Sequence, residues 1–457
     1  MALASIDPAS GRVVASWPEA GDAEVLDALR RSAAAFEEWS RTSVEERAGV
    51  LRRAAVLLRV EAEGYARLMA EEMGKPLPQG RAEVEKCAWA CEHYAEVAAA
   101  ELANQPVATE DFDSHVAFRP LGPLLAIMPW NFPFWQVLRC AAPNLAAGNT
   151  ALLKHAGSVQ GCAQAIVSLL HRAGLPDDAF INLPVDGGRV AALIARPEIA
   201  AVTLTGSTKA GRAVGQAAGA ALKKSVLELG GSDPYVVLAG ADVERAAESC
   251  VASRLINTGQ SCIAAKRFIV VDAVRALFTE AVVERMRTAA QGAPLRQPDV
   301  ALGPLARADL RDELAAQVDA SVTRGARLLL GGRTPRGEGA FYPPTVLDQV
   351  RPGQPAFDEE TFGPVAAIVP ARDEEQAFAL ANASPFGLGA ALFTADAERG
   401  ALLAERRLNA GSCFVNDYVR SDPRLPFGGI KASGYGRELG SFGLREFVNV
   451  KTVCVRR

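Results

Sequence analysis

The amino-acid sequence predicts an α/β protein with two doubly wound sheets. Short apolar runs alternate with amphipathic helical stretches over residues 121–228, and a second series of the same kind begins near Asp233. Strands that alternate with helices at this spacing form βαβ units with parallel strands. The chain of 457 residues is also long enough for two or three domains, since one domain takes about 100–200 residues.

Each predicted element follows from its own pattern. Ala-rich amphipathic segments between Ala23 and Ala103 predict helices. The first alternating series predicts strands at residues 122–128, 150–154, 180–185, 200–206 and 225–231, and helices at 134–148, 159–174, 189–195 and 208–224. The second series predicts strands at 234–240, 267–271, 389–394 and 412–416, and helices at 243–257, 273–290 and 397–408. Residues 115–122 and 447–457 predict strands of neither sheet, and such orphan strands usually pair elsewhere, often with another subunit.

Composition excludes several classes of protein. The formal net charge of −4 gives no electrostatic basis for binding nucleic acid or an anionic membrane. No apolar run of about 18 residues predicts a membrane span, and the N-terminal sequence lacks the pattern of a secretory signal. The eight cysteines are scattered without a CxxC pair, which predicts mostly buried thiols and a reducing, cytoplasmic location. We assign no metal site.

A turn between a predicted strand and a predicted helix is a candidate phosphate site. It reads "LTGSTKAG" (residues 204–211) and contains Gly206 and Ser207. Glycine lets the backbone approach a ligand, and the start of a helix offers unpaired N–H groups. The turn matches neither GxGxxG nor a P-loop. A phosphate site and a plain strand-to-helix turn therefore both stay open.

Lys154 stands at the end of the second predicted strand of the first series. In doubly wound dinucleotide folds an acidic residue in this region usually binds the adenosine ribose. Here Lys154 is followed by His155 and Gly157, with no carboxylate close by in the sequence. A cation at this place favours a ligand with a 2′-phosphate, and the alternative is an ordinary solvated lysine. We interpret His155 as a neighbour of this site rather than as a catalyst.

Cys262, in the stretch "NTGQSCIAAKR", is a candidate nucleophile. A cysteine hydrolase needs a histidine to hold the thiolate, and none of the four histidines lies within thirty residues in the sequence. A turn or a helix start can lower a thiol pKa without histidine, and its N–H groups can hold an oxyanion. Taken alone, a structural cysteine remains the alternative.

Five motifs together identify a family. They are "MPWNFPFW" with Asn131, "LELGGSDP" with Glu228, "GQSC" with Cys262, "EETFGPV" with Glu360, and "LPFGGIKASGYGRELG". In this order and over the whole chain they resemble the aldehyde dehydrogenase superfamily. The resemblance implies a dinucleotide-binding domain from residues 1–106 and 121–228, a catalytic domain from residues 229–434, and oligomerisation strands at 107–120 and 440–457. It also implies a homodimer or a homotetramer.

The resemblance implies a role for each catalytic residue. Cys262 attacks the aldehyde carbon to form a thiohemiacetal, and the Asn131 amide with the Cys262 backbone N–H stabilises the oxyanion. Hydride transfer to the nicotinamide leaves a thioester. Glu228 activates the water that hydrolyses this thioester to a free acid. Relatives that release the thioester to coenzyme A usually lack this glutamate, so its presence favours hydrolysis.

The resemblance also implies the cofactor contacts. These are Pro129, Trp130, Lys154, His155, Gly157, Gly187, Gly206, Ser207, Glu360 and Phe362. Many NAD-preferring members carry a glutamate three residues after the strand-end lysine, where this chain has Gly157. We therefore expect NADP or NAD as the cofactor, with NADP favoured.

Further stretches resemble the short-chain succinate-semialdehyde dehydrogenase branch, which implies oxidation of succinate semialdehyde to succinate. A helix that starts near Pro133 would place Trp135 and Arg139 on one face. The expected substrate-binding residues are Trp135, Arg139, Ser261, Arg420 and Ser421. Arg139 and Ser421 are expected to hold the far carboxylate, and a structural ion pair of Arg139 is the alternative. Other short aliphatic or aromatic aldehydes, a cysteine hydrolase or thioesterase, and an inactive scaffold protein are the competing hypotheses.

Overall fold

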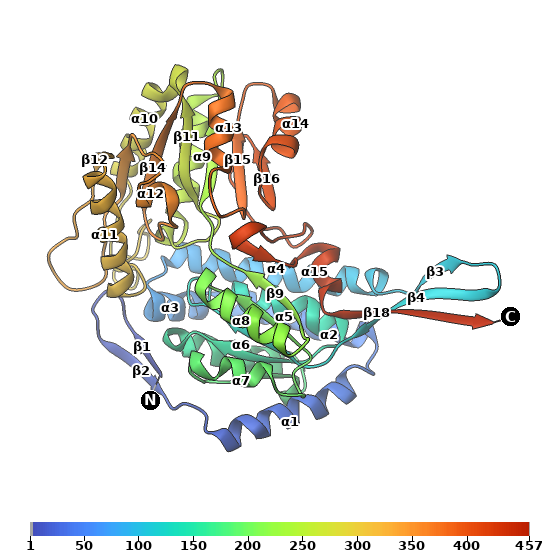
Figure 1. Cartoon of the computed structure of the whole chain (residues 1–457). Coiled ribbons are helices and arrows are strands. Elements are labelled where there is room, and N and C mark those ends of the chain that lie inside the picture. Colours follow the sequence, from blue (N-terminus) through green and yellow to red (C-terminus); the bar gives the residue numbers. More distant parts are fainter. Residues whose placement is uncertain (1–2, 457) are drawn as a thin grey trace.

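Parallel strands with helices packed on them make up both halves of the molecule, as the alternating sequence pattern predicts (Figure 1). The computed structural model describes residues 3–456. The strand order of the first sheet is β17 (Gly434–Tyr435), β9 (Lys224–Glu228), β8 (Ala201–Thr205), β5 (Leu124–Met128), β6 (Ala151–His155) and β7 (Phe180–Asn182). The strands from β9 to β7 are parallel, and β17 pairs antiparallel with β9.

The second sheet occupies the upper half of Figure 1. Its order is β12 (Arg327–Leu330), β13 (Thr345–Asp348), β14 (Val365–Ala371), β11 (Ala265–Val271), β10 (Asp233–Val237), β15 (Gly389–Phe393) and β16 (Ser412–Val415). These strands are parallel except that β12 pairs antiparallel with β13. The predicted strands of the second series correspond to β10, β11, β15 and β16, while β12, β13 and β14 were not predicted.

The predicted helices lie close to their expected positions, while the helices at Ala308–Thr323, Pro355–Asp358, Glu374–Asn382 and Gly440–Glu446 were not predicted. Those of the N-terminal half are α1 (Asp22–Trp39), α2 (Val44–Val60), α3 (Ala62–Met73), α4 (Leu77–Glu101), α5 (Trp135–Ala147), α6 (Gln160–Arg172), α7 (Val190–Ile194) and α8 (Thr208–Ala220). The others are α9 (Val243–Leu255), α10 (Asp272–Arg287), α11 (Ala308–Thr323), α12 (Pro355–Asp358), α13 (Glu374–Asn382), α14 (Ala397–Arg407) and α15 (Gly440–Glu446). Helix α5 starts at Trp135, one residue after the start of the predicted range 134–148 and two after Pro133. Within residues 3–456, no helix has both the length and the apolar character needed to cross a bilayer.

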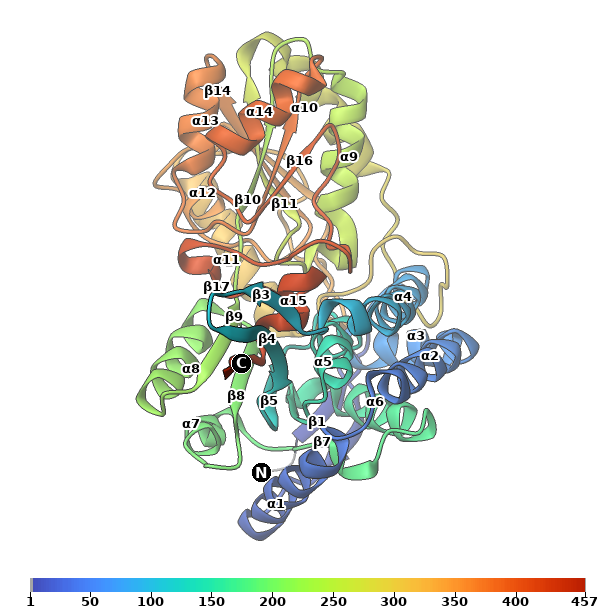
Figure 2. The same ribbon diagram turned by 90° about the vertical axis from the view of Figure 1, so that its right-hand side faces the viewer.

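The two orphan strands pair with each other. They are β4 (Phe112–Pro120) and β18 (Val448–Arg456), and with β3 (Gln105–Ala108) they form a separate antiparallel sheet in the order β18-β4-β3. The sheet projects from the body of the molecule and carries the C-terminal end of the chain (Figures 1 and 2). The prediction that these strands belong to neither large sheet is confirmed. A hairpin of β1 (Leu3–Ile6) and β2 (Val13–Trp17) near the N-terminus was not predicted.

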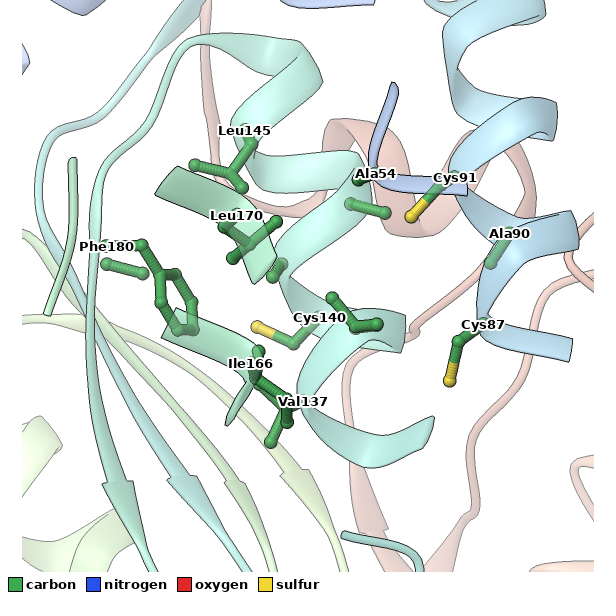
Figure 3. Close-up of a cluster of buried hydrophobic side chains, with 14 of the residues drawn as sticks. Ala54, Cys87, Ala90, Cys91, Val137, Cys140, Leu145, Ile166, Leu170 and Phe180 are labelled. Atoms are coloured by element: carbon green, nitrogen blue, oxygen red, sulfur yellow. The ribbon is translucent and has the colours of Figure 1, made fainter. Parts of the chain in front are cut away.

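Helix α5 is the centre of the core that positions the site. All of its residues are buried, including the polar side chains of Gln136, Arg139 and Asn144. Figure 3 shows its Val137, Cys140 and Leu145 among side chains of α2, α4, α6 and β7. The cysteines Cys87 and Cys91, four residues apart on α4, are buried in the same cluster. Five of the eight cysteines are buried, which confirms that most of them serve as small core residues.

Candidate active site

A strained turn brings the cysteine of the "NTGQSC" motif into position. Asn257, Thr258 and Gly259 have φ values of 54°, 56° and 78°, a left-handed conformation that β-branched residues rarely adopt. Asn257 Nδ2 donates to the backbone oxygen of Asn131 at 2.6 Å. A Cβ at Gly259 would lie 2.2 Å from a backbone oxygen, so only glycine fits there. The turn thereby ties the loop before Cys262 to the "PWNF" loop of the other half.

Two cavities meet at Cys262. One, of about 290 Å³, lies at the carboxyl ends of β5, β8 and β9, and the predicted residues that line it are Pro129, Trp130, Asn131, Gly206, Ser207, Glu360 and Phe362. The other, of about 340 Å³, is lined by all the predicted substrate residues, which are Trp135, Arg139, Ser261, Arg420 and Ser421. Cys262 lines both cavities. A thiol at this junction can contact a ligand in each cavity at the same time.

The surroundings of the Cys262 thiol disfavour its charged form. Burial raises its pKa to about 12, while the positive charges of Lys266 and Arg139 act in the opposite direction. Lys266 Nζ donates to the backbone oxygens of Ser261 at 2.9 Å and of Cys262 at 2.6 Å. Within residues 3–456, no histidine makes a hydrogen bond or an ion pair with this thiol. Catalysis therefore needs another group to take the thiol proton.

The Asn131 side chain presents its amide protons to the junction. Its Oδ1 accepts a hydrogen bond from Gln136 Nε2 at 3.1 Å, and its Nδ2 donates to the Gln260 backbone oxygen at 3.1 Å. An amide nitrogen has two protons, so one is left for a ligand. In the described chain no protein acceptor takes the backbone N–H of Cys262. These two donors can hold an oxyanion beside the thiol.

Two residues that the sequence did not single out hold this loop in place. Lys75 and Glu83 form a buried ion pair. Glu83 Oε1 accepts the N–H groups of Phe134 and Trp135, both at 2.9 Å, and so caps the start of α5. Lys75 Nζ donates to the Asn131 backbone oxygen at 2.9 Å. The pair fixes the backbone that carries the oxyanion donor.

Glu228 is a buried carboxyl group without a hydrogen-bond partner. Neither of its oxygens has one in the described part of the molecule. Burial and the negative charge of Glu438 raise the pKa of Glu228 well above its usual range, and Arg139 opposes this shift. A Cβ placed on Gly428 would lie 2.7 Å from Glu228 Oε1. The carboxyl group thus lies against Gly428, outside the cavities that Cys262 lines.

The glycine pair after Glu228 is required by its neighbours. A Cβ at Gly230 would lie 2.4 Å from Glu360 Oε2, and a Cβ at Gly231 would lie 2.6 Å from the Cys262 backbone oxygen. Glu360 Oε1 accepts the Gly231 N–H at 3.0 Å and lies 3.5 Å from Lys266 Nζ. The "LELGG" motif therefore lets Glu360 and the nucleophile loop approach the same backbone.

Aromatic rings and a helix start form the wall of the smaller cavity. The rings of Trp130 and Phe362 meet edge to face, with centroids 5.8 Å apart. Ser207 Oγ accepts the Ala210 N–H at 3.2 Å and caps α8. The first N–H groups of a helix lack intrahelical partners and attract anions.

Lys154 has an acidic neighbour that the local sequence does not reveal. Burial lowers the pKa of this partly buried lysine, and the charge of Asp186, on the loop after β7, acts in the opposite direction. A carboxylate distant in the sequence therefore acts on Lys154, although none lies close by in the sequence. Gly187 follows Asp186 and is exposed, whereas Gly157 packs against β1, where an added Cβ would lie 3.0 Å from Leu3.

The buried ring of His155 lies among backbone groups of the protein. Its ring nitrogens lie 3.1 Å and 3.0 Å from the backbone oxygens of Met128 and Pro133, and Nδ1 also accepts the Ala156 N–H. Burial lowers the pKa of His155 to about 4, so the ring is neutral. The ring nitrogens are thus occupied by backbone groups, and the cofactor contact of His155 stays a prediction.

The cations of the larger cavity differ in their partners. Arg139 forms a buried ion pair with Glu438, with Nε and Oε2 2.5 Å apart, and donates to Thr205 Oγ1 at 3.1 Å. Arg420 pairs with Asp417 at 2.7 Å. Lys86 of α4, which the sequence did not single out, also lines this cavity.

Comparison with known proteins agrees with this geometry. The model of the aldehyde dehydrogenase family matches residues 1–453, and the chain belongs to that family. It is 50% identical over 449 residues to the succinate semialdehyde dehydrogenase Sad, named as NAD(P)+-dependent, of Escherichia coli strain K12, covering 98% of this chain and 97% of that protein. It is 43% identical to a succinate-semialdehyde dehydrogenase of Mycobacterium leprae, named as NADP+-dependent, over the full length of both.

Solved structures share the fold. The crystal structure of succinic semialdehyde dehydrogenase from Streptococcus pyogenes in complex with NADP+ has a TM-score of 0.97 and 34% identity, with 100% of each chain covered. A structure of lactaldehyde dehydrogenase has a TM-score of 0.97 and 31% identity, covering 100% of this chain and 96% of that one. The predicted aldehyde dehydrogenase fold is confirmed.

Proposed function

We propose that this aldehyde dehydrogenase oxidises succinate semialdehyde to succinate with NADP or NAD, NADP being favoured. The observation that carries the proposal is the position of Cys262, which lines both cavities. Relatives at 43–50% identity are named succinate-semialdehyde dehydrogenases. The larger cavity supports a substrate with a carboxylate, because three cationic side chains line it: Lys86, Arg139 and Arg420.

The cofactor-side residues fit a nicotinamide dinucleotide. The smaller cavity lies at the carboxyl ends of parallel strands, where such folds bind ligands, and the capped start of α8 borders it. We propose that Ser207 and the α8 N–H groups hold the pyrophosphate, that Glu360 holds the nicotinamide ribose, and that Lys154 binds the adenosine ribose or its 2′-phosphate. Asp186 weakens the preference of Lys154 for a phosphate, so NAD remains usable.

The chemistry follows from the protein's own groups. The Cys262 thiol loses its proton to solvent water, helped by the positive charges of Lys266 and Arg139. Its sulfur then bonds to the aldehyde carbon, and the Asn131 amide and the Cys262 N–H stabilise the resulting oxyanion. When bound, the nicotinamide accepts the hydride. Glu228 then takes a proton from the water that hydrolyses the thioester, and the raised pKa makes this carboxylate a stronger base. Because no hydrogen bond holds the Glu228 carboxyl group, its side chain can turn toward the thioester without losing one.

We also propose that the chain forms a homodimer or a homotetramer through the sheet of β3, β4 and β18, together called the arm. Strand β18 is an edge of the arm, and its Val450 and Val455 are exposed. A long exposed edge strand is a template for pairing with another chain. A cytoplasmic location is part of the proposal, supported by eight free cysteines.

Substitution of the nucleophile tests the proposed function. Cys262→Ala should remove at least 99% of the dehydrogenase turnover, about 2.7 kcal/mol or more in activation free energy, while NADP still binds. Reduced nicotinamide absorbance and cofactor fluorescence titration measure the two quantities. Cys413→Ala is the matched control, since this partly buried thiol lies on β16. Turnover in Cys262→Ala that equals the control would overturn the assignment.

A further inference from the structure

The three cations of the larger cavity are not equally available to a substrate. Glu438 balances the charge of Arg139 within the protein, and Asp417 balances that of Arg420. Lys86 differs, because its hydrogen-bond partner is the neutral Ser421 Oγ, at 2.7 Å. Among residues 3–456, no carboxylate lies within ion-pair distance of Lys86 Nζ.

The surroundings of Lys86 hold its ammonium group at the cavity wall. The Nζ atom lies 4.5 Å from the centre of the Trp135 ring, a cation–π arrangement. Burial, and then the positive charge of Arg139, lower the pKa of Lys86 to about 8. A partly buried cation without a counter-ion is unfavourable, so a bound anion would relieve this cost.

The hydrogen-bonding groups at this place match a carboxylate. An ammonium group has three N–H donors, and the Ser421 Oγ uses one of them. The hydroxyl that accepts this bond still has its own proton to donate. One carboxylate can therefore accept from both Lys86 and Ser421, in the same cavity that Cys262 lines.

We propose that Lys86, together with Ser421, binds the carboxylate of the substrate at the end remote from the reacting aldehyde. The inference rests on the proposed function. Lys86 thus takes the place of Arg139 as the principal carboxylate ligand. Arg139, held by its ion pair with Glu438, instead shapes the wall between the cavity and Glu228. The ligand class is a short ω-oxo carboxylic acid, of which succinate semialdehyde is the member tested.

The test compares two aldehydes in each of four proteins. For wild type, Lys86→Met, Lys86→Arg and Arg81→Met, kcat/KM is measured with succinate semialdehyde and with butanal, which has the same chain length without the charge. Methionine keeps the contact with Trp135 and removes the ammonium group. Arg81 lies on the same helix but outside the cavity, which makes its variant the matched control. Thermal melting verifies that each variant is folded.

The ratio of the two kcat/KM values should fall about 10- to 100-fold in Lys86→Met, through the KM for succinate semialdehyde, because a charge-assisted hydrogen bond is lost. It should recover most of its wild-type value in Lys86→Arg and stay unchanged in Arg81→Met. A folded Lys86→Met with an unchanged ratio overturns the inference and leaves the proposed function intact. A wild-type enzyme that prefers butanal overturns the proposed function itself. If Lys86→Met unfolds, a Lys86→Arg ratio below 10% of wild type overturns the inference, and a retained ratio supports it.

Discussion

At the scale of single residues, the proposed mechanism depends on two groups whose charged forms are disfavoured by burial. Cys262 has a pKa raised to about 12, and the pKa of Glu228 is raised well above its usual range. The positive charges of Lys266 and Arg139 favour the thiolate. The Asn131 amide has an N–H group left to donate to the oxyanion. Before the aldehyde binds, burial therefore disfavours both the Cys262 thiolate and the Glu228 carboxylate.

Loss of the general base should separate the two halves of the reaction. Glu228→Gln should still form the thioester but hydrolyse it slowly, because the amide cannot take a proton from water. Rapid mixing should show a burst of about one reduced cofactor per active site, followed by turnover at least 100-fold below wild type. Glu198→Gln, at a surface ion pair, is the control. A linear progress curve at the normal rate would mean that another group is the base.

The protonation state of Lys86 should make the affinity for succinate semialdehyde depend on pH. Its pKa of about 8 lies below the ordinary value because of burial and Arg139, whereas Cys87, Asp422 and Glu83 act in the opposite direction. The ammonium form exists below this pKa and is lost above it. The KM for succinate semialdehyde should therefore rise about tenfold per pH unit above pH 8, following the loss of the cation, and the KM for butanal should not. Parallel changes of both KM values would assign the effect to another group.

The residues proposed for the site could be singled out in the sequence because each lies in a short motif. Asn131, Glu228, Cys262 and Glu360 each lie two or three residues from a glycine or a proline. The role that we propose for Lys86 could not be predicted, since a lysine between Glu85 and Cys87 on an amphipathic helix looks like a solvated residue. Glu83 caps the start of α5, and Glu438 forms an ion pair with Arg139. Both contacts join residues that are far apart in the sequence. The charge of Asp186 acts on Lys154 only because the strands before them, β7 and β6, are neighbours in the sheet.

At the scale of elements, the alternation of apolar runs was enough to predict β5–β9 and the helices between them. Strands β12, β13 and β14 were missed for a physical reason. They are separated by glycine- and proline-rich stretches, and their order in the sheet depends on pairing with β11 from an earlier part of the chain. Such pairings are not encoded in local propensity. The domain boundaries remain a prediction.

The arm should determine the oligomeric state. Removing residues 448–457 deletes β18, and with it the exposed edge that we propose pairs with a second subunit. Sedimentation velocity at a fixed protein concentration should then show a smaller species than the full-length chain. Circular dichroism is the control for folding of the large sheets. An unchanged sedimentation coefficient, beyond the loss of ten residues, would contradict the proposed role of β18.

At the scale of the whole molecule, the two halves supply different parts of one site. The first sheet contributes Glu228, the "PWNF" loop and the start of α8, while the second half contributes the nucleophile loop, Glu360 and Phe362. Buried polar contacts such as Asn257 to Asn131 join the two. The cavities on either side of Cys262 exist only because these halves are packed together. Function thus depends on the interface between the sheets.

The central claim is that Cys262 joins a nicotinamide cavity to a cavity built for a carboxylated aldehyde. The most direct test is to measure the wild-type kcat/KM for succinate semialdehyde and for butanal, with NADP and with NAD. The absorbance of reduced nicotinamide is the readout. We predict a preference for succinate semialdehyde of at least about tenfold, equal to about 1.4 kcal/mol, with both cofactors reduced and NADP favoured. A preference for butanal, or no cofactor reduction with either aldehyde, would contradict the claim.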